Sequence, residues 1–131
     1  MSRVDDMLAR ARSGLERMRP LRAKEIADAG GLLVDIRPHA CRADEGEIPG
    51  SVVIERIHLE WRLDPAGAHR IPGLDPDTPV VVFCNEGYAS SLAARNLREL
   101  GLAAATDLIG GFRAWRAAGL PVREGGTAAL D

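Results

Sequence analysis

The sequence predicts an α/β fold, with a parallel β-sheet covered by helices on both faces. Two observations support this prediction. Short runs of mostly apolar residues, such as residues 32–36 and 80–83, have the composition of strands that are buried on both faces. Segments with the apolar spacing of helices alternate with these runs, and strands that alternate with helices build parallel sheets.

The elements follow in chain order. In residues 3–17 apolar side chains recur on one helical face, which predicts an amphipathic helix that packs on the domain edge or, alternatively, binds a partner. A second helix is expected over residues 20–29, because Pro20 suits a first helical turn. Strands are expected at residues 32–36, 51–54, 80–83 and 105–109. Further helices are expected at residues 92–100 and 112–118. Loops are expected at residues 37–50 and 55–78, the second with a helical turn near 59–63.

Composition narrows the range of functions. The 131 residues suffice for one domain with one core, and a net charge of -2 favours neither nucleic acid nor an anionic membrane as partner. No apolar run is long enough to span a bilayer, and the first residues lack a signal-peptide core, so we expect a cytoplasmic protein. Two cysteines and three scattered histidines predict neither a disulfide scaffold nor a metal site.

The segment around Cys84 carries most of the chemical information. Cys84 follows a buried strand and precedes a short loop and a helix. Unpaired N–H groups and the positive end of the helix dipole favour negative charge at such a place, so the thiol loses its proton more easily and becomes a nucleophile. The segments Asp35-Ile36-Arg37 and Glu55-Arg56 also stand at strand ends, so we expect them at the same sheet edge as Cys84, where ligands bind in open α/β sheets.

Four motifs, in order, resemble the rhodanese (sulfurtransferase) family. They are Leu33-Val34-Asp35-Ile36-Arg37-Pro38; Gly46-Glu47-Ile48-Pro49-Gly50-Ser51; the loop Cys84-Asn85-Glu86-Gly87-Tyr88-Ala89-Ser90; and Asp107-Leu108-Ile109-Gly110-Gly111-Phe112-Arg113-Ala114-Trp115 with Gly119-Leu120-Pro121-Val122. The resemblance covers about residues 20–122.

This resemblance implies a rhodanese-like five-stranded parallel sheet, whose fifth, short strand lies around residues 17–19. With the helix predicted from apolar spacing and the Gly/Ala-rich composition after residue 123, we divide the chain into residues 1–19 (N-terminal amphipathic helix and first short strand), 20–123 (the rhodanese-like domain) and 124–131 (a flexible tail). The resemblance also implies that Cys84 takes sulfane sulfur as a persulfide from thiosulfate or another persulfide and passes it to a thiophilic acceptor or a partner-protein thiol, without cofactor or metal. Gly87 is then expected to allow a tight loop of N–H donors, and Ser90 to cap the following helix.

The loop departs from the family pattern at two positions. Active members often carry arginine where this chain has Asn85 and Ala89, and Glu86 adds negative charge. We therefore expect weak thiosulfate activity or another donor, such as a protein persulfide. Arg37 and Arg56 are the candidates to restore positive charge from neighbouring segments.

Other roles stay open at this point. Asp35 and Arg37 are expected to support the architecture, with Arg37 paired to Asp44, Glu45 or Glu47. Tyr88 either shapes the pocket mouth or packs against the loop, and Cys41 is a surface thiol or a resolving thiol. The alternative to an enzyme is a non-catalytic rhodanese-like binding or regulatory module. Phosphatase or arsenate reductase chemistry is disfavoured, because the arginine of a Cys-x5-Arg loop is replaced by Ser90.

Overall fold

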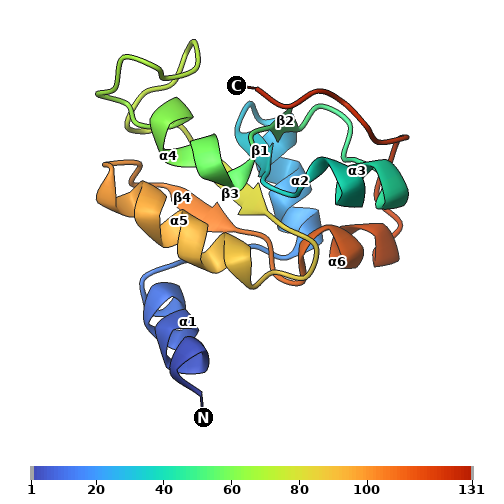
Figure 1. The fold of residues 1–131 in the computed structure, drawn as a ribbon, viewed down its shortest axis with the longest axis horizontal. Helices are drawn as coiled ribbons and strands as arrows, with labels where there is room; N and C mark the ends of the chain where they lie inside the picture. The colour runs from blue at the N-terminus through green and yellow to red at the C-terminus, as the bar shows by residue number, and fades with distance from the viewer. Residues whose placement is uncertain (1, 131) are drawn as a thin grey trace.

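The computed structural model describes residues 2–130, whose centre is a parallel sheet with the strand order β2-β1-β3-β4 (Figure 1). The strands are β1 (Leu32–Asp35), β2 (Val52–Val53), β3 (Val80–Phe83) and β4 (Ala105–Asp107). The helices are α1 (Arg3–Ser13), α2 (Pro20–Asp28), α3 (His39–Glu45), α4 (Leu59–Arg62), α5 (Ala89–Glu99) and α6 (Gly111–Ala117), with a 3-10 turn η1 (Arg56–His58) before α4.

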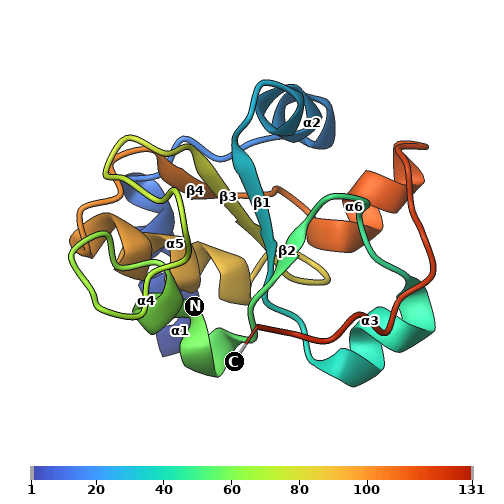
Figure 2. The ribbon, with the colours of Figure 1, turned by 90° about the horizontal axis from the view of Figure 1, so that it is seen from above.

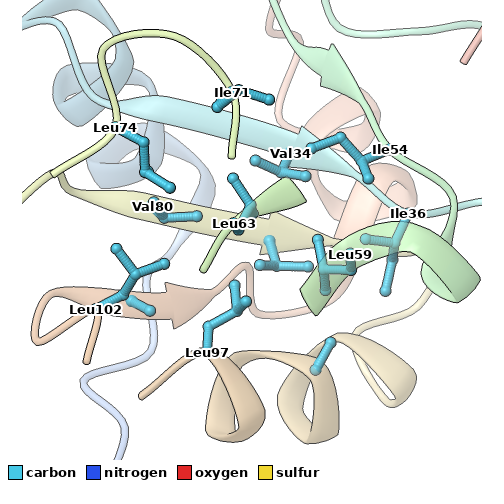
Figure 3. Packing of buried hydrophobic residues seen from close by; sticks show 13 residues of the cluster. Val34, Ile36, Ile54, Leu59, Leu63, Ile71, Leu74, Val80, Leu97 and Leu102 are labelled. Carbon is cyan, nitrogen blue, oxygen red and sulfur yellow. The ribbon is translucent and has the colours of Figure 1, made fainter. Parts of the chain in front are cut away.

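Helices cover both faces of the sheet, as the view along the layers shows (Figure 2). Helices α4 and α5 pack on one face over a cluster that includes Val34, Val80 and Leu97 (Figure 3). Helices α2 and α6 pack on the other face over a second cluster, centred on Phe83 and Phe112. All four residues of β3 are buried, which explains why this strand is an unbroken apolar run.

The parallel register brings three chemically important positions to one edge of the sheet. Asp35 pairs in register with Phe83, the residue before Cys84, and Asp107 pairs with Val82. Because parallel strands end at the same edge, the carboxyl ends of β1, β3 and β4 place Asp35, Cys84 and Asp107 there together.

The fifth strand is reduced to a single bridge. Met18 pairs in parallel with Leu108, its N–H donates to the Asp107 carbonyl at 3.0 Å, and its carbonyl accepts from Ile109 N–H at 2.8 Å. Among residues 2–130 the sheet therefore has four strands, and the prediction of five was wrong in that respect. The physical reason is that Pro20 begins α2 two residues after Met18, which leaves no room for a longer ladder.

Other boundaries also differ from the predictions. Residues 39–45, which were expected in a loop, form α3 directly after Pro38. Helix α1 ends at Ser13, before Gly14, and the helix after Cys84 begins at Ala89, so that the last two loop residues belong to its first turn. The strand expected at 51–54 is limited to Val52–Val53.

The segment after α6 returns along α3 to β2. Arg123 and Glu47 form an antiparallel bridge, Thr127 N–H and Oγ1 donate to the Glu47 carboxylate at 3.1 and 2.6 Å, and Leu130 pairs with Ile54. The flexibility expected for residues 124–131 stays a prediction. Within residues 2–130, no helix has both the length and the apolar character to cross a membrane.

Candidate active site

Cys84 stands at the end of β3, at the start of the loop that leads to α5. Its side chain is half-buried. The Sγ atom accepts the N–H of Gly87 at 3.2 Å and lies 3.4 Å from Ser90 Oγ. The Cys84 carbonyl accepts the N–H of Phe112 at 2.8 Å, which anchors the residue to the start of α6. The sulfur thus accepts one main-chain N–H, from Gly87, and can donate its own proton to the Ser90 oxygen, while it keeps partial exposure.

Glycines set the shape of this loop. Gly87 has φ +89°, as the sequence predicted for a conformation that other residues rarely adopt, and a Cβ there would lie 2.8 Å from Gly110 N. At Gly111 a Cβ would lie 2.5 Å from the Cys84 carbonyl oxygen. The pair Gly110-Gly111 therefore lets the Cys84 loop approach the turn before α6 at backbone distance.

Main-chain donors of the loop that follows Cys84 remain unpaired among the described residues. Within residues 2–130, five N–H groups of the loop and the first turn of α5 have no acceptor from the protein; they belong to Asn85, Glu86, Tyr88, Ala89 and Ser90. Together with the N-terminus of an eleven-residue helix, these groups favour an anion at the loop.

Ser90 does not cap α5, in contrast to the prediction. It lies inside the first turn, fully buried, and its hydroxyl donates to Asp107 Oδ2 at 2.8 Å. Ser91 Oγ donates to the same oxygen at 2.7 Å. Arg17 donates to both carboxylate oxygens, from Nε to Oδ1 at 2.8 Å and from Nη2 to Oδ2 at 3.2 Å. Asp107 is thus a buried acceptor that connects Arg17 to Ser90, whose hydroxyl faces the Cys84 sulfur.

Asp35 and Arg37 form a buried pair on the opposite side of the loop. Arg37 donates to both Asp35 oxygens, at 3.0 and 2.7 Å, and to the Gly46 carbonyl at 2.8 Å. The predicted pairing of Arg37 with residue 44, 45 or 47 was wrong, because Asp35 lies closer along the same strand end. Arg37 Nη1 also donates to Asn85 Oδ1 at 3.2 Å and thereby holds the residue next to Cys84.

Glu47 belongs to a separate buried cluster. Arg42 Nη1 lies 2.9 Å from Glu47 Oε2, and Arg123 adds a second cation at 3.2 Å. Burial disfavours the ionised form of Glu47, but hydrogen bonds from Thr127 and Arg42 and the charge of Arg123 outweigh burial and hold the pKa of Glu47 below its ordinary value.

The charges of Arg56 and Glu86 are compensated locally. Arg56 Nη1 contacts both Glu60 oxygens, at 2.8 and 2.9 Å. Within residues 2–130 Arg56 makes no hydrogen bond or ion pair with the Cys84 loop. Glu86 pairs with Arg113 at 3.0 Å, so its negative charge has a counter-ion.

Arg12 reaches the loop from α1. Its Nη2 donates to the Gly87 carbonyl at 2.7 Å, its Nε donates to Ser91 Oγ at 3.0 Å, and its guanidinium lies 5.8 Å from the ring centroid of Tyr88. The Tyr88 ring is exposed, at the rim of the loop. Helix α1 therefore packs on this domain, where it contacts α5 (Figure 1).

Arg12, Arg17, Ser91 and Asp107 are the site residues that sequence reasoning missed. Asp107 had a usable signal, because it ends a predicted parallel strand, as Asp35 does. The arginines had none, since both lie before the first motif; Arg12 reaches the loop through the packing of α1, and Arg17 lies beside the Met18 bridge. Cys41 lies half-buried on α3, and within residues 2–130 it has no hydrogen bond to Cys84.

Comparison with known proteins agrees with this geometry. The rhodanese-like domain family matches residues 20–118. The chain belongs to the family of rhodanese-like sulfurtransferases. It is 32% identical over 104 residues to the thiosulfate sulfurtransferase GlpE of Pseudomonas fluorescens (strain SBW25), covering 79% of this chain and 87% of that protein.

Solved structures with this rhodanese-like fold include two whose names differ. A protein of unknown function from Rhodopseudomonas palustris CGA009, described as a possible tyrosine phosphatase, has a TM-score of 0.83 and 32% identity, covering 94% of this chain and 96% of its own. The polysulfide-sulfur transferase homodimer of Wolinella succinogenes has a TM-score of 0.70 and 28% identity, covering 89% and 84%. The predicted family and the α/β fold are thus confirmed. Within residues 2–130, no three His, Cys, Asp or Glu side chains are grouped so that they could hold a metal ion.

Proposed function

We propose that this rhodanese-type sulfurtransferase carries sulfane sulfur as a persulfide on Cys84. The observation that carries this proposal is the environment of the sulfur, which is half-buried, accepts the Gly87 N–H and is surrounded by a loop with unpaired main-chain donors. Such donors stabilise both a thiolate and a persulfide anion without a basic side chain in the loop.

The reaction has two steps. The Cys84 thiolate attacks the outer sulfur of a donor such as thiosulfate; a new S–S bond forms, the S–S bond of the donor breaks, and sulfite leaves with the electron pair. A thiophilic acceptor, cyanide or a thiolate, then attacks the outer sulfur of the Cys84 persulfide. Thiocyanate or a new persulfide leaves, and the Cys84 thiolate is regenerated.

The donors and acceptors that we propose are small sulfur compounds or the thiol of a partner protein. The relatives support this range, because one is named as a thiosulfate sulfurtransferase and another as a polysulfide-sulfur transferase. A cytoplasmic location and the absence of a nucleic-acid or membrane partner belong to the same proposal.

Phosphatase chemistry is the competing activity, because one similar structure is described as a possible tyrosine phosphatase. In this chain the sixth position after Cys84 is Ser90, and its hydroxyl already donates to Asp107. A bidentate clamp on a phosphate needs a guanidinium at that place, so sulfur transfer fits the loop better.

The test is intact mass after incubation with thiosulfate, polysulfide or a protein persulfide. We expect the protein to gain the mass of one sulfur atom, the Cys84→Ser variant to gain none, and the Cys41→Ser control to load as the wild type does. A wild type that gains no sulfur from any of the three donors would instead support the non-catalytic binding module.

A further inference from the structure

Most arginines at the Cys84 loop are neutralised by a carboxylate. Arg37 pairs with Asp35 at 2.7 Å, and Arg17 pairs with Asp107 at 2.8 Å. Arg113 lies 3.0 Å from Glu86. These pairs hold the loop in place, but their fields largely cancel, so they attract an anionic substrate weakly.

Arg12 differs from these arginines in its partners. It contacts two neutral oxygens, the Gly87 carbonyl and Ser91 Oγ, and the face of an exposed tyrosine. Within residues 2–130, no carboxylate lies within ion-pair distance of Arg12, and its Nη1 donates to no protein atom. A guanidinium has five N–H donors, so Arg12 keeps both its charge and donors for another anion.

The fold holds this cation at the loop. Ser2 and Asp5 form a capping box at the start of α1, and the buried Ala11 packs against the domain next to Arg12. After α1, the chain is tied to β4 through the Met18 bridge. Arg12 thus belongs to a helix that is capped at its start and followed by a segment bound to the sheet. In the sequence, Arg12 precedes residues 20–118, which match the family.

The electrostatic surroundings agree with this placement. Partial burial and the neighbouring charge of Arg17 lower the pKa of Arg12, while the negative charge of Asp107 opposes that shift. The Gly87 carbonyl that accepts from Arg12 belongs to the same residue whose N–H donates to the Cys84 sulfur, so one residue links the guanidinium to the sulfur.

We propose that Arg12 is a specificity-determining residue of the Cys84 site, and that it supplies the positive charge that the loop lacks and so favours small anionic sulfur donors of the thiosulfate class. This inference rests on the proposed function for the identity of the substrate. It alters one expectation from the sequence, in which Arg37 and Arg56 were the candidates for this charge; both are paired with carboxylates.

Two alkylating agents test the charge without any sulfur transfer. Iodoacetate is an anion and iodoacetamide is neutral, and both react with a thiolate in the same way. We expect the ratio of their rates at Cys84 to fall about fivefold in Arg12→Gln, which keeps a hydrogen-bonding side chain but removes the charge. Arg12→Lys should keep most of the ratio, and the matched control Arg3→Gln, an exposed arginine of the same helix, should keep all of it.

Salt gives a measurement that needs no variant. In the wild type, rising ionic strength should lower the iodoacetate rate at Cys84 more than the iodoacetamide rate. Cys41 serves as the internal reference in every sample, with a ratio that Arg12→Gln leaves unchanged. An equal ratio at Cys84 in the wild type and Arg12→Gln, or a ratio that does not respond to salt, would overturn the inference.

Turnover with thiosulfate then connects the charge to the substrate. In Arg12→Gln we expect KM for thiosulfate to rise about fivefold with a smaller change in kcat, since the cation acts mainly in binding the donor. The two proposals fail in different ways. If Cys84 never gains sulfur, the transferase function fails while the alkylation ratio still reports on Arg12; if sulfur transfer proceeds but neither the ratio nor KM changes, only the role of Arg12 fails.

Discussion

The two flanks of the Cys84 loop are built from different kinds of ionic contact. On the flank of β1, Arg37 and Asp35 are both almost completely buried, and each satisfies the other. On the flank of β4, the buried Asp107 is paired with Arg17, whose side chain is 17% exposed, and Arg12 has no carboxylate partner among residues 2–130. We call the first flank, Asp35 and Arg37, the closed flank, because its two charges compensate each other. The second flank, Arg12, Arg17 and Asp107, is the open flank, because it has one positive charge more than it has negative charges.

The two flanks are therefore expected to control different properties of the site, namely the position of the loop and the electrostatic potential at the loop. Arg37 holds Asn85 and the Gly46 carbonyl in place, so the closed flank fixes the position of the loop. Arg12 contacts the Gly87 carbonyl of the loop and has no carboxylate partner among residues 2–130, so we expect the open flank to set the local potential. Changes on the closed flank should therefore affect mainly stability, and changes on the open flank mainly reactivity.

The largest effect is expected on the closed flank. Asp35→Ala leaves the buried Arg37 guanidinium without its carboxylate, and breaking a buried pair costs about 3–5 kcal/mol. Urea unfolding measures this loss. The control is Asp28→Ala, which removes an exposed partner of Lys24 and should cost less than about 0.5 kcal/mol. Similar losses in the two variants would show that Arg37 finds another partner or water, and the flank would not be closed.

A smaller loss of stability and a change in reactivity are expected for Asp107→Asn on the open flank. The variant weakens the contacts with Arg17, Ser90 and Ser91 but keeps an oxygen acceptor, so we expect about 2 kcal/mol by urea unfolding. It also removes a negative charge two hydrogen bonds from the sulfur, which favours the thiolate. Iodoacetamide should therefore react faster with Cys84 at mildly acidic pH. An unchanged or slower rate would show that Asp107 has no electrostatic influence on the sulfur.

The fold was largely predictable because its strands are buried on both faces. The unbroken apolar residues of β3 and the turn glycines around it indicate a parallel strand directly from composition. Helix α3 was not predictable in this way, because it buries a charged residue, Arg42, and so lacks an apolar face. The single bridge at Met18 depends on where α2 begins in space, which periodicity does not describe.

The site was predictable only where it lies within one segment. Cys84 and Gly87 follow from the order strand, cysteine, glycine loop and helix. Asp107 and Arg12 meet that loop through contacts that connect residues more than 15 positions apart in the chain. A cation delivered from another helix leaves no trace in the loop sequence, so the absence of loop arginines gave no indication that Arg12 contacts the loop.

A pH-dependent effect is expected at Glu47, next to the closed flank. The pKa of Glu47 lies below its ordinary value of 4.5, so its ionised form stabilises the fold above that pH, and this contribution is lost as the pH falls through the lowered pKa. The wild type should therefore unfold at higher urea concentration than Glu47→Gln at neutral pH, and the gap should narrow below pH 4.5. A gap that is constant with pH would mean that Glu47 contributes through packing and not through its charge.

The smallest change in stability is expected for Arg12→Gln. Removal of the Arg12 guanidinium leaves no buried group without a hydrogen-bond partner, because Gly87 O still accepts from Arg17 and Ser91 Oγ still donates to Asp107. Only two hydrogen bonds at a partly exposed site and the contact with the Tyr88 ring are lost, which amounts to about 1 kcal/mol by urea unfolding. If this variant instead loses as much stability as Asp35→Ala, Arg12 is a structural arginine like Arg37, and the two flanks do not differ in the way that their contacts indicate. A small loss combined with a reduced iodoacetate ratio would place its role in the electrostatics of the site.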